Sequence, residues 1–380
     1  MSYLTFNSVG VTALSAAVPR TIINNYNYTR YFDKEQVKQV VDKVEIYQRR
    51  FADEHTCSSD LCFAAASKLI EDNNIDRSDI DLLIFISQTP DYRMPATSVL
   101  LQDRLGLPSS TVAFDINLGC SAFLYGLSVA YSMLSSGNFK KALILDGETR
   151  SKVYSPKDRR TAFLFGDGGV AALVERDNRF GTSYFSLNSD GSRGDLIKIK
   201  AGGYRMPSSA ETVKEKVVDE YGNIRSDEQG YMNGSDVFNF VITEIPKDIK
   251  LLLANSGNSI VDCDYCVFHQ ANNFINRYLA KSIINTLTTI SPDVKIGKHV
   301  YCGAYTNIGH DAVIDDCCHI GAFGFLGGGT HISQCVTLHP RVNILPHKKI
   351  GNNAIVGASS VVVRNVSPDT TVFGIPAKKL

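Results

Sequence analysis

The sequence predicts a chain of two parts, an α/β layered domain followed by an all-β parallel β-helix. Within positions 1–175, strand-like apolar runs alternate with helix-period segments. From Ile296 to Val362 an apolar residue recurs at every sixth position, a period that fits neither an α-helix nor simple strand alternation. Because 380 residues exceed one ordinary hydrophobic core, a division into domains is expected on length alone.

The composition excludes several classes of function. The 39 basic residues balance the 39 acidic ones, which argues against a dedicated nucleic-acid or membrane surface. No run approaches the roughly 18 apolar residues needed to span a bilayer, and residues 9–18 have no basic segment before them, so they form a strand and not a signal peptide. The nine cysteines, an odd number without disulfide-framework spacing, predict a reducing, cytoplasmic location.

The first part has the element order of a βαβαββ unit. We expect strands or strand pairs at 9–18, 81–88, 113–117, 141–146 and 163–174. Helices are predicted near 34–47, from a cap at Ser58 or Ser59, at 97–105, and from Phe123 to Leu134, with Gly137 as the stop. The charged stretch 211–220 is predicted to be a solvated surface helix or loop.

A second, shorter copy of this unit follows. The run 264–270 repeats the pattern of 81–87 and predicts a strand before a helix. About 95 residues separate Asp81 from the end of the first unit near Val174, but only 30 separate Asp264 from Val294. We therefore assign a first half at 1–175, a partial second half at 176–281, a junction at 282–293 and the repeat at 294–380.

Cys120 is the candidate nucleophile of the first part. It falls in the turn between the apolar run that ends at Asn117 and the following helix, immediately after Gly119. Unpaired N–H groups and the macrodipole at a helix start favour a thiolate. The alternative is a buried small hydrophobe, as most free cysteines are. The turn favours the nucleophile.

The second part has twelve consecutive hexads. Glycine often follows the apolar position, as expected where the chain turns a corner of a triangular prism, and three faces per turn give about four coils. The predicted inward residues are Ile296, Cys302, Ile308, Ile314, Ile320, Leu326, Ile332, Leu338, Ile344, Ile350, Val356 and Val362.

Four stretches within positions 1–281 resemble β-ketoacyl-(acyl-carrier-protein) synthase III, a member of the thiolase fold. They are 88–95 (QTPDYRMP), 119–122 (GCSA), 165–169 (FGDGG) and 269–272 (HQAN). The resemblance implies a Claisen condensation, in which Cys120 takes an acyl group from acyl-CoA and malonyl-carrier protein loses carbon dioxide and attacks the thioester. His269 would be the hydrogen-bond donor and partner of Cys120. The alternative for His269 is a structural histidine at a strand end.

The sequence departs from that family in two places. The family has an asparagine in a Gly-Asn-Thr-Ser-like turn well after the histidine, and this chain has no such turn. The pair Asn285-Thr286 stands too close to His269 and lacks the glycine, so no residue receives that role. The family also often clamps the adenine of CoA with Trp and Arg. This chain has no Trp, and its nearest basic residues there are Lys43 and Lys152.

The repeat resembles the sugar acetyltransferases of the left-handed β-helix superfamily, of the sialic-acid O-acetyltransferase and bacillosamine N-acetyltransferase type. The match rests on 308–311 (IGHD), on His319 and on the ending 372–377 (VFGIPA). The resemblance implies acetyl transfer from acetyl-CoA to a hydroxyl or amine of a free or nucleotide-linked amino sugar. His310 would be the general base, oriented by Asp311, with His319 and Gly328 toward the cofactor. The alternative for His310 is an exposed corner residue.

Two signals suggest a metal, and neither is assigned one. Cys263 and Cys266 have zinc-like spacing without a second pair nearby, so they are interpreted as core or lining residues of the strand before His269. Cys317, Cys318 and His319 stand together, but the period of six explains Cys318 as a wall position. No metal and no tightly bound cofactor is expected, with acetyl-CoA, another acyl-CoA or acyl-carrier protein as co-substrate.

Three functional hypotheses remain open. The first is an acyltransferase fusion in which both parts handle thioester-activated acyl groups and the β-helix carries the intact site. The second is a condensing enzyme of fatty acid biosynthesis with the β-helix as an oligomerisation module. The third is a non-catalytic fusion product. Trimeric β-helices, joined to dimeric synthase parts, would build a hexamer.

Overall fold

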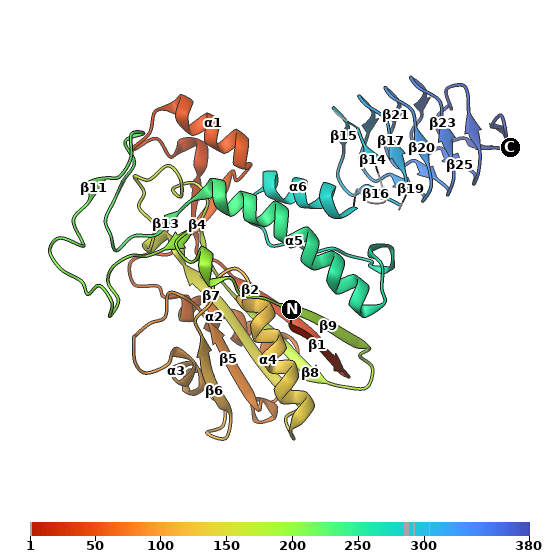
Figure 1. Cartoon of the computed structure of the whole chain (residues 1–380). Helices are drawn as coiled ribbons and strands as arrows, with labels where there is room; N and C mark the ends of the chain where they lie inside the picture. Colours follow the sequence, from red (N-terminus) through yellow and green to blue (C-terminus); the bar gives the residue numbers. More distant parts are fainter. Residues whose placement is uncertain (1, 285–288, 292, 304) are drawn as a thin grey trace. The chain divides into compact units, whose positions relative to one another are not determined.

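The computed structural model describes residues 2–284, 289–291, 293–303 and 305–380. These form two compact units, each described by itself. The first unit comprises residues up to 248 together with 268–276, and the second comprises 249–267 with 277–380 (Figure 1). Residues 285–288 and 292, which belong to the predicted junction 282–293, lie outside the described residues. The pair Asn285-Thr286 is among them.

A five-stranded sheet forms the centre of the first unit, in the order β2-β8-β7-β5-β6. β5 pairs in parallel with both β6 and β7, whereas β8 runs antiparallel to β7 and to β2. The predicted strands of the first half are therefore present, except that the pair expected at 163–174 is a single strand, β8, preceded by turns at 161–164. The bounds are β2 (Val9–Ala17), β5 (Leu82–Ile86), β6 (Val112–Ile116), β7 (Lys141–Thr149) and β8 (Asp167–Arg176).

Helices cover both faces of this sheet. The side chains of Leu83 and Phe85 pack with α2 (Ser58–Asp72) and α3 (Thr97–Arg104), and those of the alternate residues Leu82, Ile84 and Ile86 pack with α4 (Ala122–Ser136). Figure 1 shows α2, α3 and α4 beside the strands of this sheet. All five residues of β5 are fully buried, as a parallel strand between two helical layers requires. The central strands and α4 thus fix the position of the turn between β6 and α4.

The start of α2 differs slightly from the prediction. Cys57, and not Ser58 or Ser59, occupies the N-cap position. The Asp60 carboxylate accepts the backbone N–H of Cys57 at 2.8 Å, which places the first helical turn one residue earlier than a serine cap would.

Further elements complete the chain up to residue 284. The charged stretch 211–220 contains the short strand β11, so it is a loop with a hairpin and not a helix. The remaining elements are β1 (Ser2–Asn7) with β9 (Thr182–Leu187), β3 (Thr21–Asn24) with β4 (Gln48–Phe51), α1 (Lys34–Val44), β10 (Ile197–Lys198) with β13 (Tyr231–Met232), β11 (Lys216–Val217) with β12 (Ile224–Arg225), α5 (Gly234–Ser256) and α6 (Asn273–Ile284). Within the described ranges, no helix has both the length and the apolar character needed to cross a membrane.

The strand predicted at 264–270 is wrong. The chain there has no regular secondary structure, and the side chains of Tyr265 and Val267 are 88% and 91% exposed. A strand forms only where neighbouring strands accept its backbone hydrogen bonds. The sequence between Asp264 and the repeat is too short to supply the closing strands that this copy would need.

Short strands, nearly all of two residues, build three sheets in the second unit, and their pairings are parallel except that of β27 with β28. From β14 to β23, each strand pairs with the third strand after it, as Asn307 does with Phe325, so three hexads make one rung. The strands are β14 (Thr289–Ile290), β15 (Lys295–Ile296), β16 (Tyr301–Cys302), β17 (Asn307–Ile308), β18 (Val313–Ile314), β19 (His319–Ile320), β20 (Phe325–Leu326), β21 (His331–Ile332), β22 (Thr337–Leu338), β23 (Asn343–Ile344), β24 (Lys349–Ile350), β25 (Ile355–Val356), β26 (Val361–Val362), β27 (Thr371–Phe373) and β28 (Lys378–Lys379).

The predicted inward positions from Ile308 to Val362 form one core and are at most 1% exposed. Ile296 is 43% exposed because its strand β15 lies at the edge of its sheet, with a neighbour on one side only. A glycine after the inward residue is required by the next coil: a Cβ atom on Gly309 would lie 2.4 Å from the backbone N of Gly328. This arrangement fits the predicted hexapeptide coil.

Candidate active site

Cys120 lies in the turn between β6 and α4, as predicted. β6 ends at Ile116, Ser121 is the N-cap of α4, and the N–H of Ala122 donates to the carbonyl of Gly119 at 2.8 Å. Cys120 is an exposed residue, although the protein atoms around its thiol desolvate the sulfur in part. A helix of 15 residues places its partial positive charge beside this side chain, which favours the thiolate.

His269 is the hydrogen-bonding partner of Cys120. The hydrogen bond from His269 lowers the pKa of the Cys120 thiol, and the same bond raises the pKa of His269. Both shifts favour the thiolate with a protonated imidazole. Although 149 positions separate the two residues, they belong to the same compact unit. The structure therefore brings the two predicted residues together.

Three polar side chains that the sequence did not single out lie beside Cys120. Arg150 Nη2 donates to Gln88 Oε1 at 2.5 Å and to Glu148 Oε1 at 3.1 Å. Glu148 also accepts the backbone N–H of Gln88 and the hydroxyl of Thr89, each at 2.8 Å. Their positions in the sequence could have indicated this, because Gln88 follows β5 closely and Glu148 and Arg150 stand at the end of β7. The carboxyl ends of parallel strands meet at the edge where the β6–α4 turn lies.

Below this network, burial raises the pKa of Asp146 to about 6, with a smaller contribution from Glu148. Burial also raises the pKa of Tyr154, whose ring stacks on Phe165 at 4.3 Å between centroids. Two partly buried titratable groups, Asp146 and Tyr154, thus interact electrostatically with the residues around Cys120.

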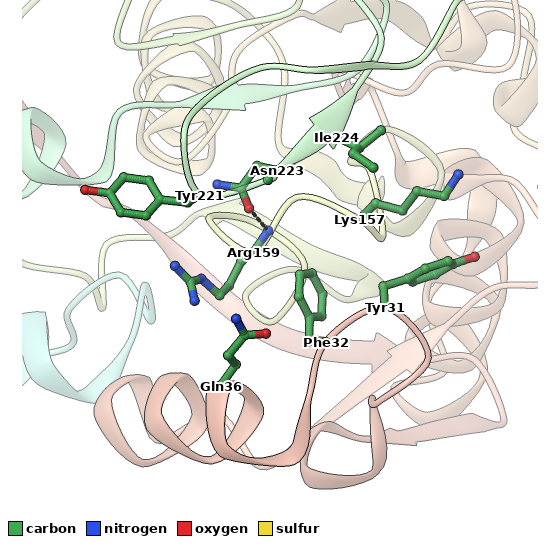
Figure 2. A pocket seen from close by; sticks show the side chains of 9 residues that line it. Tyr31, Phe32, Gln36, Lys157, Arg159, Tyr221, Asn223 and Ile224 are labelled. Atoms are coloured by element: carbon green, nitrogen blue, oxygen red, sulfur yellow. Dashed lines mark hydrogen bonds between the residues drawn. The ribbon is translucent and has the colours of Figure 1, made fainter.

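A separate cavity of about 250 Å³ opens in the same unit (Figure 2). The backbone N–H of Arg159 donates to Asn223 Oδ1 at 2.9 Å, and Lys157 is paired with Glu215. Among the described residues, no carboxylate pairs with the guanidinium of Arg159. The lining combines two basic groups with aromatic rings; it comprises Tyr31, Phe32, Gln36, Lys157, Arg159, Tyr221, Gly222, Asn223 and Ile224.

The basic residues that the sequence suggested for CoA have other contacts. Lys152 Nζ donates to the carbonyls of Glu54 and Thr56 at 3.1 and 2.8 Å. Lys43 Nζ lies 5.9 Å above the ring of Phe274. Neither lines the cavity, whose basic groups are Lys157 and Arg159. Lys157 and Arg159 were not predicted from the sequence, because the aromatic residues that line the cavity with them come from distant segments of the chain.

In the second unit, His310, Asp311 and Gly328 come together. His310 Nδ1 and Asp311 Oδ2 are 2.8 Å apart, and about two thirds of each side chain is exposed. The imidazole covers Gly328, where an added Cβ atom would lie 2.6 Å from His310 Nε2. His319 stacks on Tyr301 with ring centroids 4.6 Å apart. A second imidazole–carboxylate pair, His331 with Asp315 at 2.8 Å, was not predicted.

No cluster suited to a metal was found in the described ranges, where three or more His, Cys, Asp or Glu side chains nowhere gather. Cys263 and Cys266 are both exposed, so their interpretation as core residues is wrong. They lie in the segment where the predicted strand does not form. Cys318 is buried in the wall of the repeat, as predicted, and Cys317 is exposed.

A five-stranded α/β half that presents a cysteine at a helix start, hydrogen-bonded to a histidine, defines a thiolase-type acyltransferase. The family model of 3-oxoacyl-[acyl-carrier-protein] synthase III matches residues 114–191. The chain is 35% identical over 263 residues to a β-ketoacyl-[acyl-carrier-protein] synthase III of Clostridioides difficile, covering 69% of this chain and 76% of that protein. It is 37% identical over 243 residues to a putative 3-oxoacyl-[acyl-carrier-protein] synthase 3 of Campylobacter jejuni, covering 64% and 68%.

Among solved structures, a 3-oxoacyl-(acyl-carrier protein) synthase from Burkholderia xenovorans superposes with a TM-score of 0.69 at 34% identity, covering 74% of this chain and 79% of that one. The chain belongs to the β-ketoacyl-(acyl-carrier-protein) synthase III family. The predicted thiolase-like fold of the N-terminal part is thereby confirmed.

Proposed function

We propose that Cys120 accepts an acyl group from acyl-CoA or acyl-carrier protein and passes it on as a thioester. The hydrogen bond between Cys120 and His269 at the start of α4 is the observation that carries this proposal. The Cys120 thiolate attacks the thioester carbonyl, and the bond from that carbonyl to the sulfur of CoA breaks. CoA leaves as a thiolate and takes up the proton held by His269.

The cavity around Arg159 supports CoA as the donor. CoA carries phosphates and an adenine ring, which need cationic groups and flat apolar surfaces. Lys157 and Arg159 supply the former, and the rings of Tyr31 and Tyr221 supply the latter (Figure 2). We assign this cavity to the nucleotide end of acyl-CoA.

We propose further that this site performs acyl transfer without the complete decarboxylating condensation. The family's asparagine has no equivalent turn after His269. The first two asparagines after His269 have structural hydrogen bonds, because Asn272 Oδ1 caps the N–H of Ile275 at 2.9 Å and Asn273 is bonded to Glu45. Neither replaces a group that would stabilise the enolate of a malonyl substrate.

A second candidate function concerns residues 294–380, which we propose to be a left-handed β-helix acetyltransferase acting on a sugar amine or hydroxyl. The parallel register of the rungs and the position of His310 over Gly328 support it. His310 Nε2 would take the proton of the acceptor while Asp311 holds Nδ1, and the acceptor would attack acetyl-CoA directly. His319 would contact the cofactor, and trimerisation of the repeat would give a hexamer if the synthase part dimerises.

Intact mass spectrometry after incubation with acetyl-CoA tests both proposals. We expect one acetyl group on the protein, absent in Cys120→Ala and present in His310→Ala. With an amino-sugar acceptor, CoA release that His310→Ala abolishes and Cys120→Ala preserves would support the second candidate. An adduct together with 3-oxoacyl product from malonyl-carrier protein would instead make the chain a full condensing enzyme with the repeat as an oligomerisation module. Folded protein with neither activity would favour a non-catalytic fusion.

A further inference from the structure

Arg150 stands at the same strand edge as Cys120 and is not part of the predicted pair. We propose that Arg150 is the cation that holds Cys120 in its reactive, ionised form, with Gln88 and Glu148 fixing the guanidinium beside the thiol. This inference rests on the proposed function in one respect, that Cys120 is the nucleophile. Arg150 acts through the thiol, so it is a positioning residue.

The geometry places the guanidinium next to the nucleophile turn. Arg150 Nη2 lies 3.9 Å from the point that a Cβ atom would occupy on Gly119, the residue before Cys120. Gln88 Oε1 lies 3.1 Å from the same point. A side chain at position 119 would therefore press on the Gln88–Arg150 hydrogen bond, and the absence of one lets the network approach the turn.

The guanidinium of Arg150 is fixed by hydrogen bonds that use only one of its nitrogen atoms. Its side chain is 16% exposed and that of Glu148 is 21% exposed, so solvent screens this charge less than a surface one. Within the described residues, all side-chain hydrogen bonds of Arg150 run through Nη2. The Nη1 and Nε groups are not used by them, which leaves donors for the developing thiolate.

The charges around Cys120 have both signs. The hydrogen bond from His269 contributes most to lowering the pKa of Cys120, burial opposes it, and the charges of His269 and then Arg150 lower it further. The facing acidic groups are Glu148, which is paired with Arg150, and Asp146, whose raised pKa keeps it partly protonated near neutral pH. Tyr154 completes the set and is neutral there because burial raises its pKa.

Such a second cation matters because, within the described part of the chain, no asparagine in a turn of the family type accompanies Cys120 and His269. With His269 as the sole cation beside Cys120, deprotonation or displacement of that one imidazole would remove the stabilisation of the thiolate. A fixed guanidinium does not titrate below pH 12. It therefore keeps part of the stabilisation independent of the state of His269.

Site-resolved alkylation of Cys120 by iodoacetamide tests the inference without any acyl donor. The Cys120 peptide is quantified by mass spectrometry in wild type, Arg150→Gln, Arg150→Lys and Lys152→Gln across pH 5–10. Lys152→Gln removes the same charge two positions away, where Nζ is bonded to the carbonyls of Glu54 and Thr56. At pH 7 we expect alkylation to slow by about three- to tenfold in Arg150→Gln, less in Arg150→Lys, and by under about twofold in Lys152→Gln.

The pH dependence separates charge from structure. Removing the cation raises the pKa of Cys120, so the rates of wild type and Arg150→Gln should converge toward pH 10, where both thiols are ionised. A loss of equal size at every pH, or a loss of the same size in Lys152→Gln, would overturn the inference. Acetylation of Cys120 in wild type with an unchanged Arg150→Gln profile would refute Arg150 and leave the proposed function standing. If Arg150→Gln shifts the alkylation profile as expected but wild type is not acetylated, the role of Arg150 stands and the proposed acyl transfer is refuted.

Discussion

The Cys120 site and the His310 site are built in opposite ways. Cys120, Gln88, Arg150 and His269 come from four segments of the chain, and the fold of the first unit assembles them. His310 and Gly328 occupy equivalent positions on successive rungs of the repeat, and Asp311 directly follows His310. The first site is partly buried and its charges perturb one another, whereas the side chains of His310 and Asp311 are about two thirds exposed. The turn that holds Cys120 was predicted from a local pattern, whereas Glu148 and Arg150, which the sheet edge places beside that turn, were not.

The largest expected difference between the two sites is that Cys120 forms a covalent acyl-enzyme and His310 does not. Cys120→Ser should reduce acyl-enzyme formation from acetyl-CoA by at least about a hundredfold, because a serine hydroxyl next to His269 is far less ionised than a thiol. His310→Ala should leave the adduct within about twofold of wild type. Intact mass measured after rapid acid quench gives both numbers. A normal adduct in Cys120→Ser would assign the nucleophile elsewhere.

The repeat should be sensitive to its inward positions and tolerant at the outward ones. Leu326 is fully buried and Phe325, beside it on β20, is 40% exposed. We expect Leu326→Ala to lower the free energy of unfolding by about 2–5 kcal/mol, and Phe325→Ala by less than about 1 kcal/mol. Urea denaturation followed by circular dichroism measures both. Equal effects would contradict the assignment of the hexad interior.

Loss of His269 should change the pH profile of Cys120 and not its accessibility. The hydrogen bond from His269 lowers the pKa of Cys120, so the thiolate persists to lower pH than in an ordinary cysteine. In His269→Ala the pKa rises, and the alkylation rate at pH 6.5 should fall by about tenfold while the rate near pH 10 changes little. His310→Ala, by comparison, should leave the Cys120 profile unchanged. A His269→Ala profile that coincides with that of wild type would mean that Cys120 is not paired with His269.

The smallest effect is expected for CoA recognition. Arg159→Ala should raise the KM for acetyl-CoA in Cys120 acylation by about three- to tenfold with little change in the maximal rate, because the cavity contacts a part of the donor remote from the thioester. Lys152→Ala should change KM by less than about twofold, since its Nζ is bonded to backbone carbonyls. The rate of Cys120 acylation, measured at several acetyl-CoA concentrations in quenched samples, gives the KM of each variant. A reversed order would move the nucleotide site to Lys152.

Local patterns predicted much of the fold. The run before Asn117 and the helix period after it located the Cys120 turn, and the period of six located the interior of the repeat from Ile308 to Val362. Each of these depends on residues close in sequence or on a fixed step. Family resemblance added His269, which sequence spacing alone does not connect to Cys120.

The failures have a common physical cause. The apolar run 264–270 has strand propensity, but propensity forms a strand only beside a neighbour, and the sequence lacks the neighbours. Arg150 and Arg159 carry no local signature, because a guanidinium becomes a site residue through what the fold places beside it. Gln88 begins the 88–95 stretch, but that stretch gave it no role. Such residues require the sheet order before they can be recognised.

The most direct test is peptide mapping of the intact chain after acetyl-CoA is mixed with it at neutral pH. The account predicts one hydroxylamine-sensitive acetyl group on the peptide that contains Cys120, formed several-fold more slowly in His269→Ala and absent in Cys120→Ala. Acetylation confined to other cysteines, or folded protein that hydrolyses no acetyl-CoA and carries no acetyl group on Cys120, would contradict it.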